Sequence, residues 1–177
     1  TFNPDRRVLT LPTYKDMPPF IYDMLVGHEV GHALYSPNAI VTKNAFDKFT
    51  KKYVNILEDC RVDRLMKTKF PGLRRDYYLT NEKWANDKFW DSEEFKLNNE
   101  SIAEMDLIDR INISDKSGSF YEVNFTAEEQ VFVDRKNTLS SFAEVLSLCE
   151  DLKAWAEEQE QEKEEQNGEE GDDSDNV

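Results

Sequence analysis

The most constraining feature of the sequence is an apolar stretch that opens at Pro18-Pro19 and contains both histidines of the chain, His28 and His32. Proline is tolerated in the first turn of a helix, and Ser36-Pro37 is a typical helix end. The spacing of the apolar residues predicts a largely buried helix between these points, with Asp16 as its cap. A separation of four residues places both imidazoles on one face of that helix, one turn apart.

The residues from His28 to His32 read His-Glu-Val-Gly-His, which fits the HExxH arrangement without a mismatch. In this arrangement two imidazoles bind one zinc ion. The glutamate, here Glu29, takes a proton from a zinc-bound water and passes it to the leaving amine. Two histidines placed at random would lie four apart in roughly one of ninety chains of this length. The competing interpretation is an apolar core helix with two hydrogen-bonded histidines.

A carboxylate is expected to complete the metal site, because catalytic zinc takes three protein ligands and no third histidine exists. A second helix, predicted over residues 44–69, carries acidic residues in a core-like stretch, where their burial is costly unless compensated. Asp59 and Asp63 share a face, so one can bind the metal while the other orients a histidine N–H. Glu58, about a hundred degrees around the helix, is the rival third ligand, and helical facing favours Asp59.

Two questions about this region stay open in the sequence. An exposed acidic pair that forms salt bridges with Arg61 and Arg64 would explain the same residues without a metal. The donor for a developing oxyanion is also not determined, since Arg61, Tyr77 and Tyr78 are all candidates.

A short strand is predicted over residues 7–12, which alternate moderately and end in proline. The part from Val8 to Leu11 either pairs with an extended substrate peptide or is an ordinary edge strand. Further along, residues 76–95 are rich in aromatic side chains and predict short helices and turns. A helix is predicted over residues 101–111, followed by a loop at 114–119 and an extended segment at 120–125. A capping box at Thr126 and Glu129 predicts the start of another helix, and a longer helix is predicted over residues 139–161. The expected fold class is mostly α (α+β), with a small edge-strand element.

Negative charge is concentrated at the C-terminal end. The chain has a net charge of −15, and residues 157–177 contribute −10 of it through eleven acidic residues and one lysine. Because this end lacks apolar residues, we expect a disordered tail or linker there, and a folded domain over residues 1–156. The rest of the chain is mildly acidic, which argues against nucleic acid as a partner.

The two cysteines, Cys60 and Cys149, fall at positions expected in a helical core. This usage favours a reduced, cytoplasmic protein over a disulfide-stapled secreted one. No apolar run approaches the roughly 20 residues of a membrane span, and no signal peptide is recognisable, so no membrane association is expected.

Together these motifs resemble the zincin-type metallopeptidases found next to von Willebrand factor A domains, which include proteins of large tailed bacteriophages and the bacterial VWA-like family. The resemblance covers residues 2–78. It is carried by Leu-Thr-Leu-Pro at residues 9–12, by the HExxH segment at 25–35, by Asn-x-x-Glu-Asp-x-Arg within 55–63, and by Phe-Pro-Gly at 70–72. The HExxH segment is common to many enzymes, and its combination with the Asn-x-x-Glu-Asp-x-Arg segment is more specific.

The resemblance implies a compact, minigluzincin-like helical domain that binds Zn²⁺ through His28, His32 and Asp59. It also implies an acidic linker that leads to a von Willebrand A domain, with such a domain or an AAA+ ATPase as partner, and the host cytoplasm as location if the chain is phage-encoded. The predicted function is hydrolysis of peptide bonds in a protein or peptide substrate. The alternative is a catalytically silent, metal-stabilised interaction module.

Overall fold

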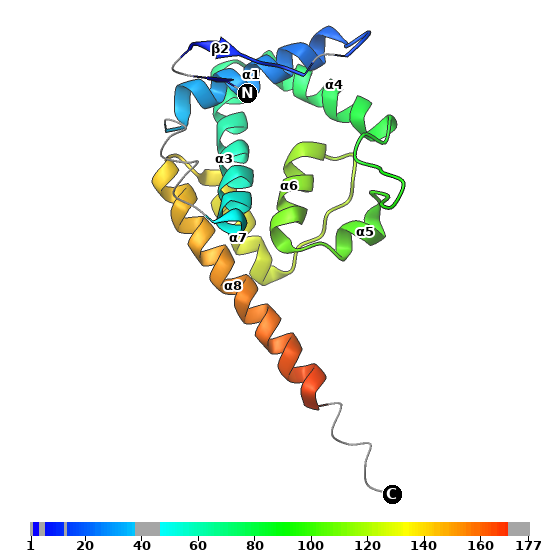
Figure 1. Ribbon diagram of the computed structural model, residues 1–177, viewed down its shortest axis with the longest axis vertical. Coiled ribbons are helices and arrows are strands. Elements are labelled where there is room, and N and C mark those ends of the chain that lie inside the picture. The colour runs from blue at the N-terminus through cyan, green and yellow to red at the C-terminus, as the bar shows by residue number, and fades with distance from the viewer. Residues whose placement is uncertain (1, 4–5, 13, 38–46, 170–177) are drawn as a thin grey trace, which may run out of the picture.

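The mostly α fold class is confirmed by the computed structural model (Figure 1), which describes residues 2–3, 6–12, 14–37 and 47–169. The strand element is a minimal antiparallel pair, β1 (Phe2–Asn3) and β2 (Val8–Leu9), with Phe2 opposite Leu9. It is shorter than the strand predicted over residues 7–12. Arg7 lies in the turn between the two strands, where its φ of 54° is incompatible with a strand.

Two long helices follow the strand pair. Helix α1 (Pro19–Tyr35) begins with proline in its first turn and has Pro18 at its N-cap without a side-chain cap, so the predicted capping role of Asp16 is wrong. Helix α3 (Lys48–Lys69) is capped by Asp47, whose side chain accepts a hydrogen bond of 2.9 Å from the backbone N–H of Thr50. Helix α3 packs against α1 on one side and against the C-terminal helices on the other.

The remaining helices depart from prediction in two places. Residues expected to form short helices and turns instead contain the 14-residue helix α4 (Leu73–Asn86). The helix predicted over residues 101–111 is divided into α5 (Asn99–Ala103) and α6 (Leu107–Ser117), so α6 extends into the predicted loop. The capping box of Thr126 and Glu129 is confirmed at the start of α7 (Ala127–Thr138).

Apolar side chains of α3, α6, α7 and α8 (Phe142–Glu169) form the main core. Burial of such side chains is the principal favourable contribution to folding. Both cysteines are free thiols in this core, as their positions suggested. The fully or nearly fully buried members include Leu57, Ile108, Ile111, Val145, Leu148 and Leu152.

The acidic C-terminal segment is helical as far as Glu169, so the helix predicted over residues 139–161 continues eight residues further into the segment predicted as a disordered tail or linker. Figure 1 shows this end of α8 projecting away from the other helices. Glutamate, glutamine and lysine are good helix formers, which explains a helix without a buried face. Residues 170–177 lie outside the described part of the chain. None of the helices in the described part of the chain has the length and apolar character of a transmembrane segment.

The contact between α1 and α3 requires a residue without a side chain. A Cβ atom on Gly31 would lie 2.5 Å from Cγ1 of Val62 and 2.7 Å from Cγ of Met66, both on α3. Val62 and Met66 are buried, so neither can move aside cheaply. Gly31 therefore brings the two helices together next to His32.

Replacing Gly31 by alanine is expected to lower the free energy of unfolding by about 1–3 kcal/mol, the usual cost of overpacking a core. The matched control is Gly72→Ala, because a Cβ atom there meets nothing within 4 Å. Urea unfolding followed by circular dichroism measures both variants. Equal stability of the two variants would contradict the close crossing.

Candidate metal centre

Two imidazoles and one carboxylate converge between α1 and α3. The Nε2 atoms of His28 and His32 lie 3.2 Å apart, and their rings meet edge to face at 82°. The Oδ1 atom of Asp59 lies 3.1 Å from Nε2 of His32 and 3.9 Å from Nε2 of His28. Between 22% and 26% of each side chain is exposed, so solvent reaches the cluster.

The outer nitrogen of His28 is held by a buried carboxylate. Its Nδ1 atom lies 2.7 Å from Oδ1 of Asp63, which also accepts a 2.5 Å hydrogen bond from the hydroxyl of Tyr77 on α4. Asp63 and Tyr77 are both buried. Three helices thus fix the orientation of one imidazole, because the carboxylate of α3 links a ring of α1 to a phenol of α4.

The outer nitrogen of His32 is held by a longer chain of hydrogen bonds. Its Nδ1 atom lies 2.9 Å from Oγ of Ser36, and the Ser36 hydroxyl donates to Oε1 of Glu58 over 2.6 Å. Glu58 in turn accepts two hydrogen bonds, of 2.8 and 2.6 Å, from the guanidinium of Arg61. Arg61 also donates to the carbonyl oxygen of Tyr35 over 2.9 Å. The Glu58–Arg61 pair is buried, and its hydrogen bonds offset the cost of removing both charges from water.

These hydrogen bonds determine where the ring protons are. A carboxylate only accepts, so Nδ1 of His28 donates to Asp63. The Ser36 hydroxyl gives its single proton to a carboxylate, so it accepts from Nδ1 of His32. When the rings are neutral, both Nε2 atoms therefore carry lone pairs, and both face Oδ1 of Asp59. Three electron-pair donors at these distances repel one another unless a proton or a metal ion lies among them.

The spacing of the three donor atoms fits a small tetrahedral metal ion. Zinc holds nitrogen and oxygen ligands at about 2.0–2.2 Å, which puts neighbouring tetrahedral ligands about 3.3–3.6 Å apart. The observed separations of 3.2, 3.1 and 3.9 Å bracket this range. Two imidazoles and a carboxylate also suit other divalent transition metals. Within the described residues, His28, His32 and Asp59 form the one group of three ligands with this geometry.

The surrounding charges shift the proton affinities of the site. Burial lowers the pKa of His28, but the hydrogen bond to Asp63 and the neighbouring negative charges outweigh burial, so this pKa lies above its ordinary value of 6.5. Burial raises the pKa of Asp59, whereas its contact with the His32 ring and the positive charges of protonated His28 and of Lys116 lower it. The pKa of Asp59 as a whole is lowered, so the carboxylate is ionised at neutral pH.

The structure separates the two predicted candidates for third ligand. Asp59 faces the imidazoles, while Glu58 points toward Arg61 and reaches His32 only through Ser36. The acidic pair is not the exposed one of the alternative interpretation, since Asp63 is buried and Arg61 binds Glu58 instead. Arg64, the other proposed partner, donates to the carbonyl oxygen of Leu139.

Glu29 follows His28 on α1 and is partly buried. Its negative charge is one of those that raise the pKa of His28. The position is the one that the HExxH arrangement reserves for a proton-transferring carboxylate.

Two of the three oxyanion candidates have other roles. Arg61 is buried against Glu58, and Tyr77 is buried and donates to Asp63. Tyr78 is exposed and packs its ring on Phe120, with centroids 5.4 Å apart.

Sequence reasoning missed two further residues at the site. Ser36 lies one helical turn after His32, and this spacing could have indicated a hydrogen bond between the two side chains. Lys116 lies 57 residues from Asp59 along the chain and contacts its Oδ2 atom, and no local pattern indicates this.

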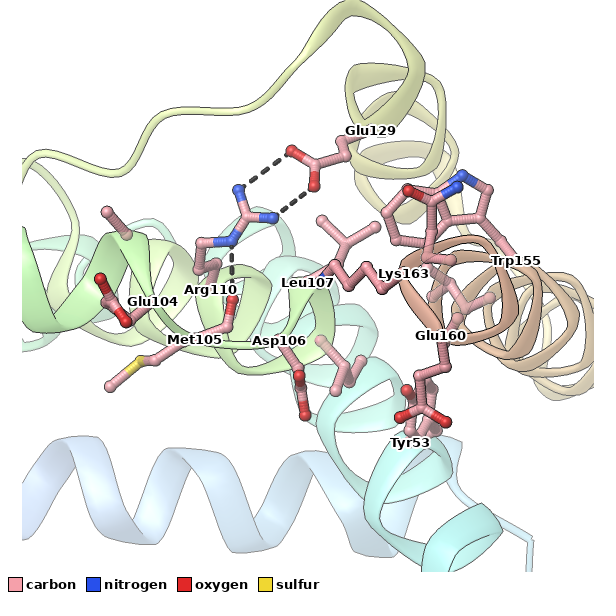
Figure 2. Close-up of a pocket in the computed structure, with 15 residues that line it drawn as sticks. Tyr53, Glu104, Met105, Asp106, Leu107, Arg110, Glu129, Trp155, Glu160 and Lys163 are labelled. Carbon is pink, nitrogen blue, oxygen red and sulfur yellow. Dashed lines mark hydrogen bonds and ion pairs between the residues drawn. The ribbon is translucent and has the colours of Figure 1, made fainter. Parts of the chain in front are cut away.

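A cavity of about 440 Å³ lies away from this cluster, between α3, α6 and α8 (Figure 2). None of the three converging side chains lines it. Its Arg110 side chain is already paired with Glu129 and donates to the carbonyl oxygen of Met105. The cavity therefore adds no ligand or base to the candidate metal centre.

Comparison of the chain with protein-family models, with curated proteins and with solved structures gives no match. The assignment of a function therefore depends on the geometry of the site.

Replacing Asp59 by asparagine is expected to lower zinc affinity by more than the roughly 10- to 100-fold that loss of an outer hydrogen-bond partner costs, while the fold is retained. Glu58→Gln is the matched variant on the neighbouring position. It should lose less zinc affinity than Asp59→Asn but more stability, because the buried Arg61 guanidinium loses its charged partner. Isothermal titration with zinc and thermal unfolding distinguish the two outcomes. Loss of zinc in Glu58→Gln alone would make Glu58 the ligand.

Zinc binding is expected to weaken as the pH falls from about 8 to 6, because protons compete for the imidazoles and the raised pKa of His28 starts this competition above pH 6.5. In metal-free protein, acidification has the opposite effect, because protonation of His28 stabilises the fold. The stabilising effect of protonated His28 is complete below about pH 6.5 and is lost as the pH rises through the raised pKa. Melting temperatures with and without zinc across this range measure the difference, which should shrink on acidification. A constant difference would refute the competition.

Proposed function

We propose that this chain is a zinc-dependent metallopeptidase that uses His28, His32 and Asp59 as metal ligands and Glu29 as general base. One observation carries the proposal. The outer nitrogens of both imidazoles are occupied by hydrogen bonds, so two inner nitrogens and one carboxylate oxygen present lone pairs to the same point. Such preorganisation by surrounding hydrogen bonds is typical of metal sites.

The chemistry follows from the donor set and from the glutamate beside it. A zinc ion bound by these ligands supplies Lewis-acid activation of a water molecule and of the scissile carbonyl. Glu29 accepts a proton from the attacking water and delivers it to the departing nitrogen, which is general base and then general acid catalysis. Asp63 and Ser36 keep the imidazoles oriented throughout, because they hold the outer nitrogens.

The number of ligands favours catalysis over a purely structural metal. Structural zinc sites are closed by four protein ligands, whereas catalytic sites keep one position for water. Within the described residues three side chains converge, and all three are partly exposed. This supports an open coordination position that a substrate can reach.

The proposed substrate is a protein or peptide, as the resemblance to von Willebrand A-associated zincins implies. The acidic end of α8, which projects from the body as a largely exposed helix, supports a role as a connector to a partner of the von Willebrand A or AAA+ type. The proposed location is the cytoplasm, with Cys60 and Cys149 both reduced.

The second candidate is a metal-stabilised interaction module without catalysis. The projecting acidic helix favours it, because such a connector serves a binding protein as well as an enzyme. The two candidates share the metal and differ in whether Glu29 transfers protons.

Replacing Glu29 by glutamine is expected to reduce peptide hydrolysis by about 10²- to 10⁴-fold, the usual contribution of a general base, while zinc content and melting temperature stay close to wild type. The assay uses a library of internally quenched peptides with zinc-loaded protein. The control is Asp23→Asn, an exposed carboxylate on the same helix. A wild-type protein that binds zinc but cleaves no peptide would favour the interaction module, and a protein that binds no metal would overturn both candidates.

A further inference from the structure

A lysine occupies the far side of the carboxylate that faces the two histidines. The Nζ atom of Lys116, on α6, lies 3.2 Å from Oδ2 of Asp59. The other oxygen, Oδ1, lies 3.1 Å from Nε2 of His32. The two oxygens of one carboxylate are therefore divided between a cation on α6 and the imidazoles of α1.

The position of Lys116 is fixed by its neighbours on α6. Asp115 forms an ion pair of 2.8 Å with the buried Lys136 of α7. Ser117 is completely buried, and α6 then ends at Gly118, whose φ of 59° and ψ of −126° only glycine adopts readily. The backbone on both sides of Lys116 is thus anchored, which distinguishes this contact from a chance pairing of mobile surface chains.

A lysine at this position opposes metal binding when only charge is considered. Its positive charge stands next to a proposed ligand of a divalent cation, and like charges repel. A partly exposed lysine–carboxylate pair such as this one also contributes little to stability, so stability alone does not account for it. The geometry of the carboxylate offers a different role, because a carboxylate can bind a metal through one oxygen or through both.

We infer that Lys116 is a positioning residue that holds Oδ2 of Asp59 away from the metal, so that Asp59 offers only Oδ1. This inference rests on the proposed metal site and adds a determinant of its coordination number. Binding through one oxygen leaves room for water beside the two imidazoles and the carboxylate. Without the lysine, the second oxygen is free to turn toward the metal and fill that room.

Cobalt(II) in place of zinc tests this role without any substrate, because its visible absorption weakens as the coordination number rises. The variants are Lys116→Met, which removes the cation, and Lys116→Arg, which keeps it. The matched control is Lys52→Met, since Lys52 on α3 forms an ion pair of 2.7 Å with Asp109 on α6, with similar exposure, but contacts no proposed ligand. All four proteins are loaded with one equivalent of cobalt and compared at the same pH.

The expected result is a clear loss of visible absorption in Lys116→Met, with wild-type spectra in Lys116→Arg and Lys52→Met. Melting temperatures should be similar in all three variants, because the lysine is partly exposed. An unchanged spectrum in Lys116→Met, even with tighter cobalt binding, would overturn the inference and leave the proposed function standing. A wild-type protein that takes up no cobalt would overturn the proposed function, and this inference with it.

Discussion

The close crossing of α1 and α3 is the constraint on which the candidate metal centre depends. Gly31 lets the helices approach until its α-carbon faces Val62 and Met66 directly. One residue later, His32 comes within 3.1 Å of the Asp59 carboxylate. With a larger residue at this point α1 would lie farther from α3, and the Nε2 atoms of the two imidazoles would no longer converge with the Asp59 carboxylate.

Helix α3 carries three acidic residues within one turn and a half, and each is compensated differently. Glu58 is neutralised by Arg61 and supports His32 through a serine. Asp63 is buried under Tyr77 and orients His28. Asp59 faces the two Nε2 atoms, with a lysine behind it. Burying charge in this way is costly unless every group is paired, so the arrangement points to a purpose other than stability.

The local part of this arrangement could be predicted, because helical periodicity alone puts residues four apart on one face. The histidine pair and the preference for Asp59 followed from that rule. Contacts between distant segments that no motif connects could not be predicted, and that of Lys116 with Asp59 belongs to this class. Helix α4 differs from the predicted short helices and turns because packing overrides the modest helix propensity of its aromatic residues. The helix α8 extends beyond the predicted end at residue 161 because its glutamates favour a helix even where apolar residues are lacking.

The most direct test is a crystal structure of the zinc-loaded protein with anomalous data collected on both sides of the zinc absorption edge. We predict one zinc peak at about 2.0–2.2 Å from Nε2 of His28, Nε2 of His32 and Oδ1 of Asp59. A zinc peak elsewhere, or imidazoles whose Nε2 atoms face different surroundings, would contradict it.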